Sequence, residues 1–350
     1  MVANVVYARL PEPGAVHVPH SPDRPESRLR LADLAHRFGL LGAWLAVIAL
    51  FGALVPETFL TWTNLQTILG SQSVLIIVTL GLVISLTAGE LDLSVAGVLT
   101  LCVVVIAKLN VLAGVPIGLA VAAAIGVGLV VGAVNAFLVV KVGIESIIVT
   151  LGMGTLLVGI SFAIEESQVG GISQVLVDAA RTQVLGIQLG FYYGLLLTAL
   201  VWYVYSFTPL GRYIYFVGAG REVARLAGVP VERIRAGALI ASSVFAAVGG
   251  IILAGLLGAT DPNVGSSFLL PAFAGAFLGA TVFTPGRFNP WGSFIAVYFL
   301  VTGITGLQLL GLSGWIEQVF YGGSLVLAVT LSRLVGRRQA RLDVSFQQES

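Results

Sequence analysis

The sequence predicts an all-α, polytopic membrane protein. Of its 350 residues, 57% are hydrophobic and 10% are charged, whereas about 25% of the residues in a soluble domain carry charge. Apolar runs such as 75–88, 115–140 and 236–258 have the length and composition of spanning helices of about 20 residues. These runs do not alternate apolar and polar residues, which excludes a transmembrane β-barrel.

Ten apolar segments form an expected transmembrane domain over residues 38–334. Residues 1–37 contain five prolines, scattered charge and few apolar side chains, so we expect a disordered cytoplasmic tail. Residues 335–350 form a second expected cytoplasmic tail. The 43 glycines are typical of helices that pack closely through small residues. The expected spans are 38–57, 65–87, 93–112, 116–140, 144–164, 191–207, 236–258, 268–283, 290–310 and 315–334.

The distribution of arginines predicts the orientation, because segments rich in Lys and Arg stay on the cytoplasmic side. One such segment precedes the first span, a second follows the sixth span and a third follows the tenth. Six spans separate the first from the second and four separate the second from the third, so all three lie on the same side of the membrane. Both termini and the connection 208–235 are therefore expected in the cytoplasm, and Glu317 at the outer interface. The arginines are Arg9, Arg24, Arg28, Arg30 and Arg37, then Arg212, Arg221, Arg225, Arg233 and Arg235, then Arg333, Arg337, Arg338 and Arg341.

Candidates for catalysis or metal binding are few. Cys102 is the single cysteine, which excludes an intramolecular disulfide and a cysteine-based metal site. His17, His20 and His36 all lie in the N-terminal tail. Because the sequence contains no recognisable pairing of a nucleophile with a base and no metal-ligand cluster, we expect no catalytic residue, no metal and no enzyme activity.

Two carboxylates, Glu90 and Asp92, and the hydroxyl of Ser94 stand between the second and third expected spans. An ionised side chain at membrane depth costs at least about 2.5 kcal/mol on insertion scales. Asp92 precedes a helix, where its carboxylate can accept bonds from first-turn N–H groups. The alternative is a substrate pathway, since a broken helix beside a cavity can bind a polar solute. That alternative requires the break to lie near the membrane midplane.

Two further polar residues lie inside expected spans. The amide of Asn135 can bond a neighbouring helix or the hydroxyls of a solute. Thr150 can line a pathway, or its hydroxyl can bond back to its own helix. The residues considered for a substrate pathway are thus Glu90, Asp92, Ser94, Asn135 and Thr150.

The connection 208–235 contains a short helix candidate. Residues 221–227 lie between Gly220 and Gly228, and Pro230 prevents the helix from continuing. Apolar and basic side chains would lie on different faces of this helix. Such a helix suits docking into the groove of a partner, and a solvated loop between two spans is the other interpretation.

Three stretches in order along the chain match motifs of one family. Residues 89–95 read Gly-Glu-Leu-Asp-Leu-Ser-Val, residues 135–144 read Asn-Ala-Phe-Leu-Val-Val-Lys-Val-Gly-Ile, and 148–152 read Ile-Val-Thr-Leu-Gly. Residues 208–212 read Thr-Pro-Leu-Gly-Arg, and 224–228 read Ala-Arg-Leu-Ala-Gly. With these motifs the sequence resembles the membrane subunits of ribose-type ATP-binding cassette (ABC) importers. The departures are Glu145 and Ser146 at common proline positions, Gly220 at a frequent asparagine, and Leu269 and Pro271 at frequent acidic positions.

The resemblance implies a permease of the bacterial inner membrane that imports a monosaccharide such as ribose or a related polyol. It also implies a second permease copy, a cytoplasmic ABC ATPase and an extracytoplasmic sugar-binding protein as partners, with lipid around the chain and no nucleic acid. A phosphate-binding loop needs a Gly-Lys pair, and the only lysines, Lys108 and Lys141, follow Ala107 and Val140. The chain is therefore expected to bind no cofactor of its own, the ATP being bound by the partner. The residues that match the ATPase-contacting loop are Gly211, Arg212, Gly218, Glu222, Arg225 and Gly228.

An ion-gradient-driven secondary transporter of a small polar solute is the alternative. Such proteins also carry acidic residues within the membrane, and Glu90 with Asp92 could exchange protons. The position of both carboxylates at a junction between spans, together with the glycine-bounded helix of the loop, favours the importer. A membrane-embedded enzyme is the third and weakest interpretation.

Overall fold

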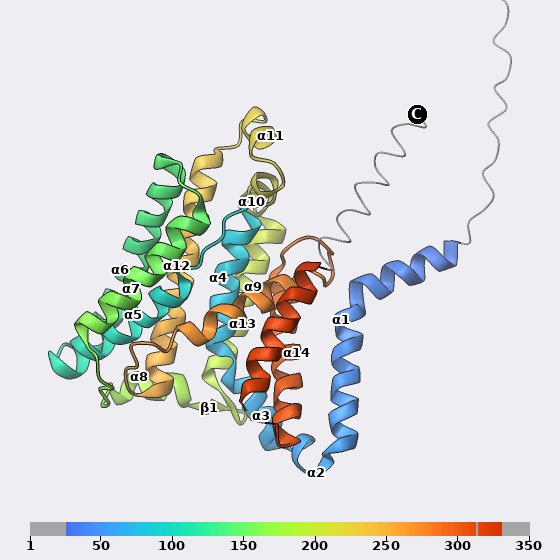
Figure 1. Cartoon of the computed structure of the whole chain (residues 1–350), viewed down its shortest axis with the longest axis horizontal. Helices are drawn as coiled ribbons and strands as arrows, with labels where there is room; N and C mark the ends of the chain where they lie inside the picture. The colour runs from blue at the N-terminus through green and yellow to red at the C-terminus, as the bar shows by residue number, and fades with distance from the viewer. Residues whose placement is uncertain (1–25, 313, 331–350) are drawn as a thin grey trace, which may run out of the picture.

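A computed structural model of the protein describes residues 26–312 and 314–330, and helices form most of this part of the chain (Figure 1). The first half contains α1 (Glu26–Leu54), α2 (Pro56–Phe59), α3 (Trp62–Ser71), α4 (Ser73–Thr87), α5 (Val95–Ala107), the π-helical turn η1 (Lys108–Leu112), α6 (Ile117–Ala136), the π-helical turn η2 (Phe137–Val142) and α7 (Ser146–Ile164). The predicted all-α class is confirmed.

The second half begins with a short helix, which packs against α12, and a small hairpin. It contains α8 (Gln174–Arg181), β1 (Gln183–Val184), β2 (Ile187–Gln188), α9 (Leu189–Phe207), α10 (Pro209–Ala219), α11 (Arg221–Leu226), α12 (Val231–Leu257), α13 (Ser266–Gly279) and α14 (Pro290–Leu309). A further helix covers residues 315–330. The two strands form a small antiparallel hairpin in which Gln183 pairs with Gln188.

Six of the described helical segments have the length and apolar composition of a membrane span. The pair α3 and α4, bent by 40° at their break, makes a seventh if it is one span. The apolar part of α1, Phe38–Leu54, and α13 are shorter. A polytopic membrane protein is therefore confirmed, and the total of ten spans stays a prediction. The six segments are α5 with η1, α6 with η2, α7, α9, α12 and α14.

The first helix begins earlier than the first expected span. The backbone of α1 is helical from Glu26, so helix extends into the segment 1–37 for which the sequence predicts disorder. Residues 1–25 and 331–350, which contain the rest of the two expected tails, lie outside the described residues.

The bundle has two distinct ends. Figure 1 shows α10 and α11 at one end, which we call the α11 end, and α2, α3, α8 and the β-hairpin at the other, which we call the hairpin end. The start of α1 and the end of the helix 315–330 both lie toward the α11 end and away from the hairpin. The segments expected on the cytoplasmic side thus share one side of the bundle wherever the structure describes them.

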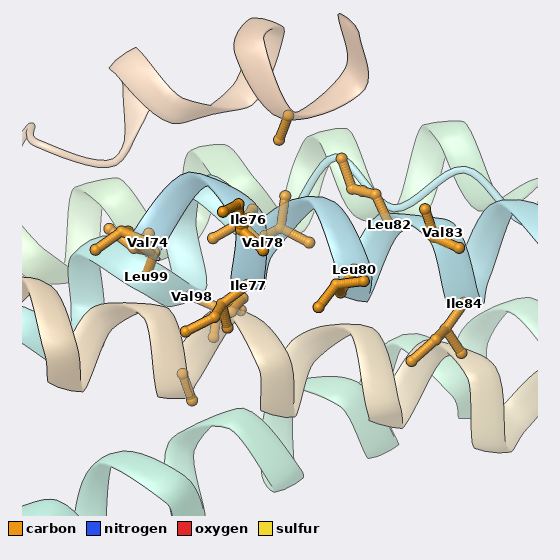
Figure 2. Close-up of a cluster of buried hydrophobic side chains, with 14 of the residues drawn as sticks. Val74, Ile76, Ile77, Val78, Leu80, Leu82, Val83, Ile84, Val98 and Leu99 are labelled. Atoms are coloured by element: carbon orange, nitrogen blue, oxygen red, sulfur yellow. The ribbon is translucent and has the colours of Figure 1, made fainter. Parts of the chain in front are cut away.

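Helix α4 runs through the centre of the bundle. All fifteen of its residues are buried, and α5, α9, α12, α13 and α14 pack around it. The side chains of α4 point outward on every side of the helix, and they pack in one cluster with Val98 and Leu99 of α5 (Figure 2). A helix that is apolar all round is expected in such a position, because no face of it needs water.

Glycines bring neighbouring helices into backbone contact. A Cβ atom on Gly97 of α5 would lie 2.7 Å from the carbonyl oxygen of Gly154 on α7. A Cβ atom on Gly132 of α6 would lie 2.7 Å from the Cα atom of Ile240 on α12. Small residues at helix crossings permit this close approach. As a result, short polar side chains on α6 and α7 can reach the turn between α4 and α5.

Candidate functional site

The turn of residues 88–94 joins α4 to α5 and contains three of the predicted site residues. Gly89 has φ +79°, a conformation that favours glycine, and the backbone N–H of Glu90 donates to the carbonyl of Ser85 at 2.9 Å. The chain therefore reverses sharply after α4. Glu90, Asp92 and Ser94 are each at most 1% exposed, so this polar turn is enclosed by protein.

A chain of hydrogen bonds links Asp92, Ser94 and Asn135. Asp92 Oδ1 accepts from the backbone N–H of Ser94 at 3.0 Å and from its hydroxyl at 2.6 Å. The amide of Asn135 on α6 donates to the Ser94 hydroxyl oxygen at 2.9 Å. Asp92 thus accepts from Ser94, the N-cap residue of α5, and not from the first-turn N–H groups considered in the sequence analysis. Asn135 bonds the same N-cap residue from α6.

Two hydroxyls of α7 bind the backbone of the same turn. The Leu93 N–H donates to the Thr150 hydroxyl oxygen at 3.0 Å, and that hydroxyl lies 3.0 Å from the Leu91 carbonyl and 2.7 Å from the carbonyl of Ser146. The Leu91 N–H donates to the Ser146 hydroxyl oxygen at 3.2 Å. The sequence analysis noted Ser146 only as a departure from a family motif and missed this contact.

The buried cluster retains unused hydrogen-bonding capacity. Among the described residues, Asp92 Oδ2, Asn135 Oδ1 and the hydroxyls of Ser242 and Ser243 on α12 are buried without a partner. A buried polar atom left unpaired costs about 1–3 kcal/mol. Asp92 and Asn135 thus each keep one oxygen in the buried cluster without a donor at normal hydrogen-bond geometry.

Glu90 forms ion pairs with two arginines from distant parts of the chain. Arg221 at the start of α11 donates to Glu90 Oε1 at 2.8 Å and to the Gly89 carbonyl at 2.9 Å. Arg235 on α12 donates to the same oxygen through Nε. One buried carboxylate therefore holds α11, α12 and the turn together. The sequence analysis assigned both arginines only to the cytoplasmic loop, because no local pattern links positions 131 and 145 residues apart.

Helix α10 packs directly on the end of α4. A Cβ atom on Gly218 would overlap the carbonyl oxygen of Thr87, and one on Gly211 would overlap the backbone of Tyr205 on α9. Thr208 caps α10 by accepting from the Gly211 N–H at 3.4 Å. Both glycines were predicted to act in coupling, and the structure gives each of them a position where only glycine fits.

The remaining coupling candidates lie near or on α11. Arg212 is exposed on α10 and lines a cavity of about 540 Å³ with Thr87 and Arg287. Arg225 donates to Glu222 at 3.0 Å and to Glu232 at 2.7 Å. Gly228, with φ +80°, ends the segment. The predicted short helix is present as α11, and it leads directly into α12.

The outer face of α11 is apolar and unusually exposed. Val223 and Leu226 are 60% and 89% exposed, whereas Ala224 on the other face is fully buried. Exposed apolar side chains at the tip of a projecting helix are typical of a surface that binds a partner. The α11 end therefore presents an exposed apolar surface outside the bundle, a candidate docking surface, and an ion pair that reaches into the bundle.

A buried polar turn within an apolar helical bundle, joined to a projecting docking helix, defines a multi-pass membrane permease. Comparison with known proteins identifies the family, since residues 64–329 match the permease components of the branched-chain amino acid transport system. The chain belongs to this family. No solved structure matches it.

Several curated proteins are similar over most of their length. The D-allose transport system permease protein AlsC of Escherichia coli is 31% identical over 303 residues, which are 86% of this chain and 93% of that protein. The autoinducer 2 import system permease protein LsrD of Photorhabdus luminescens is 29% identical over 260 residues, 72% of this chain and 78% of that protein. LsrD of Yersinia pestis is 28% identical over the same shares.

The chain is therefore a permease subunit of an ABC importer and not an enzyme. It is a multi-pass protein of the bacterial inner membrane. Family membership implies an ATPase and a binding protein as partners. It also favours the importer over the ion-gradient-driven alternative.

Proposed function

We propose that this permease carries a monosaccharide such as ribose or D-allose, or a related sugar or polyol, into the cell. The names of the similar permeases support this substrate class, because one belongs to a D-allose transport system and others to autoinducer 2 import systems. The solute crosses the membrane unchanged.

The proposed topology has ten spans in a permease domain of residues 38–334, with cytoplasmic tails at 1–37 and 335–350. The N-terminus, the coupling loop 208–235 and the C-terminus lie on the cytoplasmic side. The concentration of arginine in these segments supports the orientation. The common side of the start of α1, of α11 and of the end of the helix 315–330 is consistent with it.

Two copies of the permease form the proposed pathway, with ATPase subunits at the cytoplasmic face and an extracytoplasmic sugar-binding protein outside. The homodimer rests on the sequence resemblance. The permease binds no cofactor, and ATP is bound by the partner. The proposed ATPase contacts are Gly211, Arg212, Gly218, Glu222, Arg225 and Gly228.

The ion pair between Arg221 and Glu90 is the observation that carries the proposed coupling. A partner that moves α11 pulls on Arg221, and Arg221 is bonded to both Glu90 and the Gly89 carbonyl. Contact of Gly218 with the end of α4 provides a second, steric link. Movement at the docking surface would thus reach the turn between α4 and α5, and with it two helices of the bundle core.

Two assignments of the buried cluster make different predictions. If Glu90, Asp92, Ser94, Asn135 and Thr150 line the sugar pathway, conservative substitutions change the apparent KM for the sugar. If they brace the turn, the same substitutions lower the maximal rate at unchanged KM. Complete burial and bonding to backbone groups support the bracing role. Kinetics of Thr150→Val and Asn135→Ala separate the two assignments.

The proposed function is tested with the permease reconstituted in proteoliposomes together with its ATPase and binding protein. Uptake of radiolabelled D-ribose and D-allose is expected to require ATP and to persist when a protonophore collapses the ion gradient. Uptake by the permease alone, abolished by the protonophore, would contradict an ATP-driven importer. Failure of both sugars, with ATPase activity present, would contradict ribose and D-allose as substrates.

A further inference from the structure

We propose that a polar cavity at the hairpin end is the first binding site of the permease for a polyhydroxylated solute, an inference that rests on the proposed function. The cavity has a volume of about 400 Å³ and lies between α3, α4, α13, α14 and the helix 315–330. This volume lies within the range of about 300–1,000 Å³ that is typical of small-molecule sites. None of the residues that line the cavity belongs to the turn of residues 88–94.

The cavity wall is unusually polar for this chain. More than half of its lining residues carry a hydroxyl, amide or carboxylate, in a protein that is 57% hydrophobic. Such groups both donate and accept hydrogen bonds, as the hydroxyls of a sugar require. Phe268, Pro271 and Leu75 supply an apolar part of the wall, which suits the C–H faces of the same solute. The polar residues used in the argument are Gln72, Ser267, Thr305, Gln308, Glu317 and Tyr321.

Several of these polar groups are available to a ligand. Among the described residues, the side chains of Thr305, Gln308 and Glu317 make no hydrogen bond or ion pair. Thr305 and Gln308 belong to α14, and Glu317 belongs to the helix 315–330. Glu317 and Gln308 are exposed at the cavity, and Thr305 lies deeper. The sequence analysis expected Glu317 at the outer interface. Its place in this wall gives a charged acceptor to a surface that is otherwise neutral.

A proline within one helix and a break between two others leave further backbone groups at the cavity without helical partners. Pro271 lies inside α13, and because proline has no N–H, the carbonyl of Ser267 one turn earlier lacks its helical donor. Gln72 stands at the break where α3 and α4 bend by 40°. Broken helices at a cavity provide backbone groups that can bind a polar solute. Gln72, Ser267 and Pro271 all line the same cavity.

The position of the cavity fits the direction of transport. Figure 1 shows α3 at the hairpin end, opposite α10 and α11. In the proposed topology the hairpin end is extracytoplasmic, so a solute released by the binding protein meets this cavity first. A site of this kind would hold the sugar through Gln308 and Glu317 until the core helices around α4 open toward the α11 end.

The first test measures access to the cavity from water. Cys102 is fully buried, so introduced cysteines can be labelled over a low background. Thr305→Cys and Gln308→Cys are treated with the impermeant sulfonatoethyl methanethiosulfonate, with Leu196→Cys on the apolar surface of α9 as the control. Reaction needs a thiolate, which water stabilises and lipid does not, so labelling at the cavity is expected to be about tenfold faster or more. Equal rates would overturn the proposal, whatever the transport result.

The second test measures binding during transport. Glu317→Gln and Gln308→Ala are expected to raise the apparent KM for the transported sugar about five- to tenfold, the effect of losing one or two hydrogen bonds to a ligand, with ATPase activity unchanged. Glu57→Gln, exposed on α2 at the same end, is the matched control and is expected to behave as wild type. An unchanged KM in both cavity variants would overturn the proposed site while leaving ATP-driven uptake intact. Absence of uptake in the wild type would instead overturn the proposed function.

Discussion

Replacement of Glu90 by alanine is expected to weaken the link between α11 and the bundle core. The carboxylate is 1% exposed, and its partners Arg235 and Arg221 have side chains that are 14% and 43% exposed. Loss of one partner of a buried ion pair costs about 3–5 kcal/mol, because the other charge stays buried and unpaired. Arg221 can turn to water and adds little to this cost, so about 3 kcal/mol of destabilisation is expected, mostly through Arg235.

A double-mutant cycle separates the two arginines. The coupling energy between Glu90 and Arg235 is expected to be about 2–3 kcal/mol, and that between Glu90 and Arg221 to be about 1 kcal/mol, since the second pair is the more solvated one. Denaturant unfolding in detergent measures the stability of each variant. Glu222→Gln is the control, because its carboxylate is 81% exposed and, within the part of the chain that the structure describes, pairs with Arg225 alone.

Transport adds a readout that stability does not give. If the ion pair transmits force from α11, Arg221→Gln is expected to uncouple ATP hydrolysis from uptake several-fold while changing stability by only about 1 kcal/mol. Stability of Glu90→Ala within about 0.5 kcal/mol of wild type, together with normal coupling of Arg221→Gln, would refute this reasoning. That result would mean that both guanidinium groups find water in place of Glu90.

Three further predictions follow from contacts of the same region. Gly218→Ala is expected to push α10 from the end of α4 at a cost of about 1–3 kcal/mol and to reduce uptake, whereas Gly237→Ala, with open space at its Cβ position, is expected to leave both unchanged. Thr150→Val removes the hydroxyl that bonds the turn, and a destabilisation of about 1–2 kcal/mol at unchanged KM in uptake assays would support bracing. Leu226→Ser is expected to weaken pull-down of the ATPase subunit without altering membrane insertion, because this side chain is 89% exposed; unaltered binding would count against the docking surface.

Local features of the sequence predicted much of this fold. The helix at 221–227 could be predicted because the glycines at both of its ends and the following proline act on neighbouring backbone alone, and α11 covers Arg221–Leu226. The break between the second and third spans was equally visible in residues 88–94. The shortness of α13 was visible as well, since the expected span 268–283 is one of the shortest, and this span already contains Pro271.

Partners distant in the chain could not be predicted in this way. Nothing local distinguishes Arg235 from Arg233, yet the structure pairs Arg235 with Glu90. The bond from Leu91 to Ser146 likewise depends on how α5 crosses α7. The cavity at the hairpin end is lined by side chains from five helices, and none of these side chains is distinctive within its own segment.

The sequence by itself determined that this protein is an all-α, polytopic membrane protein, because the free energy of burying apolar segments in lipid depends mainly on their composition and length. The permease function was implied by the resemblance of its motifs to a known family. Tertiary structure decided what the polar residues do. Close contacts at glycines fix how the helices cross and therefore which side chains come within bonding distance. Because the bundle contains few polar groups, each buried polar side chain has few possible partners. The carboxylates of the turn thereby acquire different roles, since Asp92 bonds the start of α5 while Glu90 holds α11 and α12 to the core.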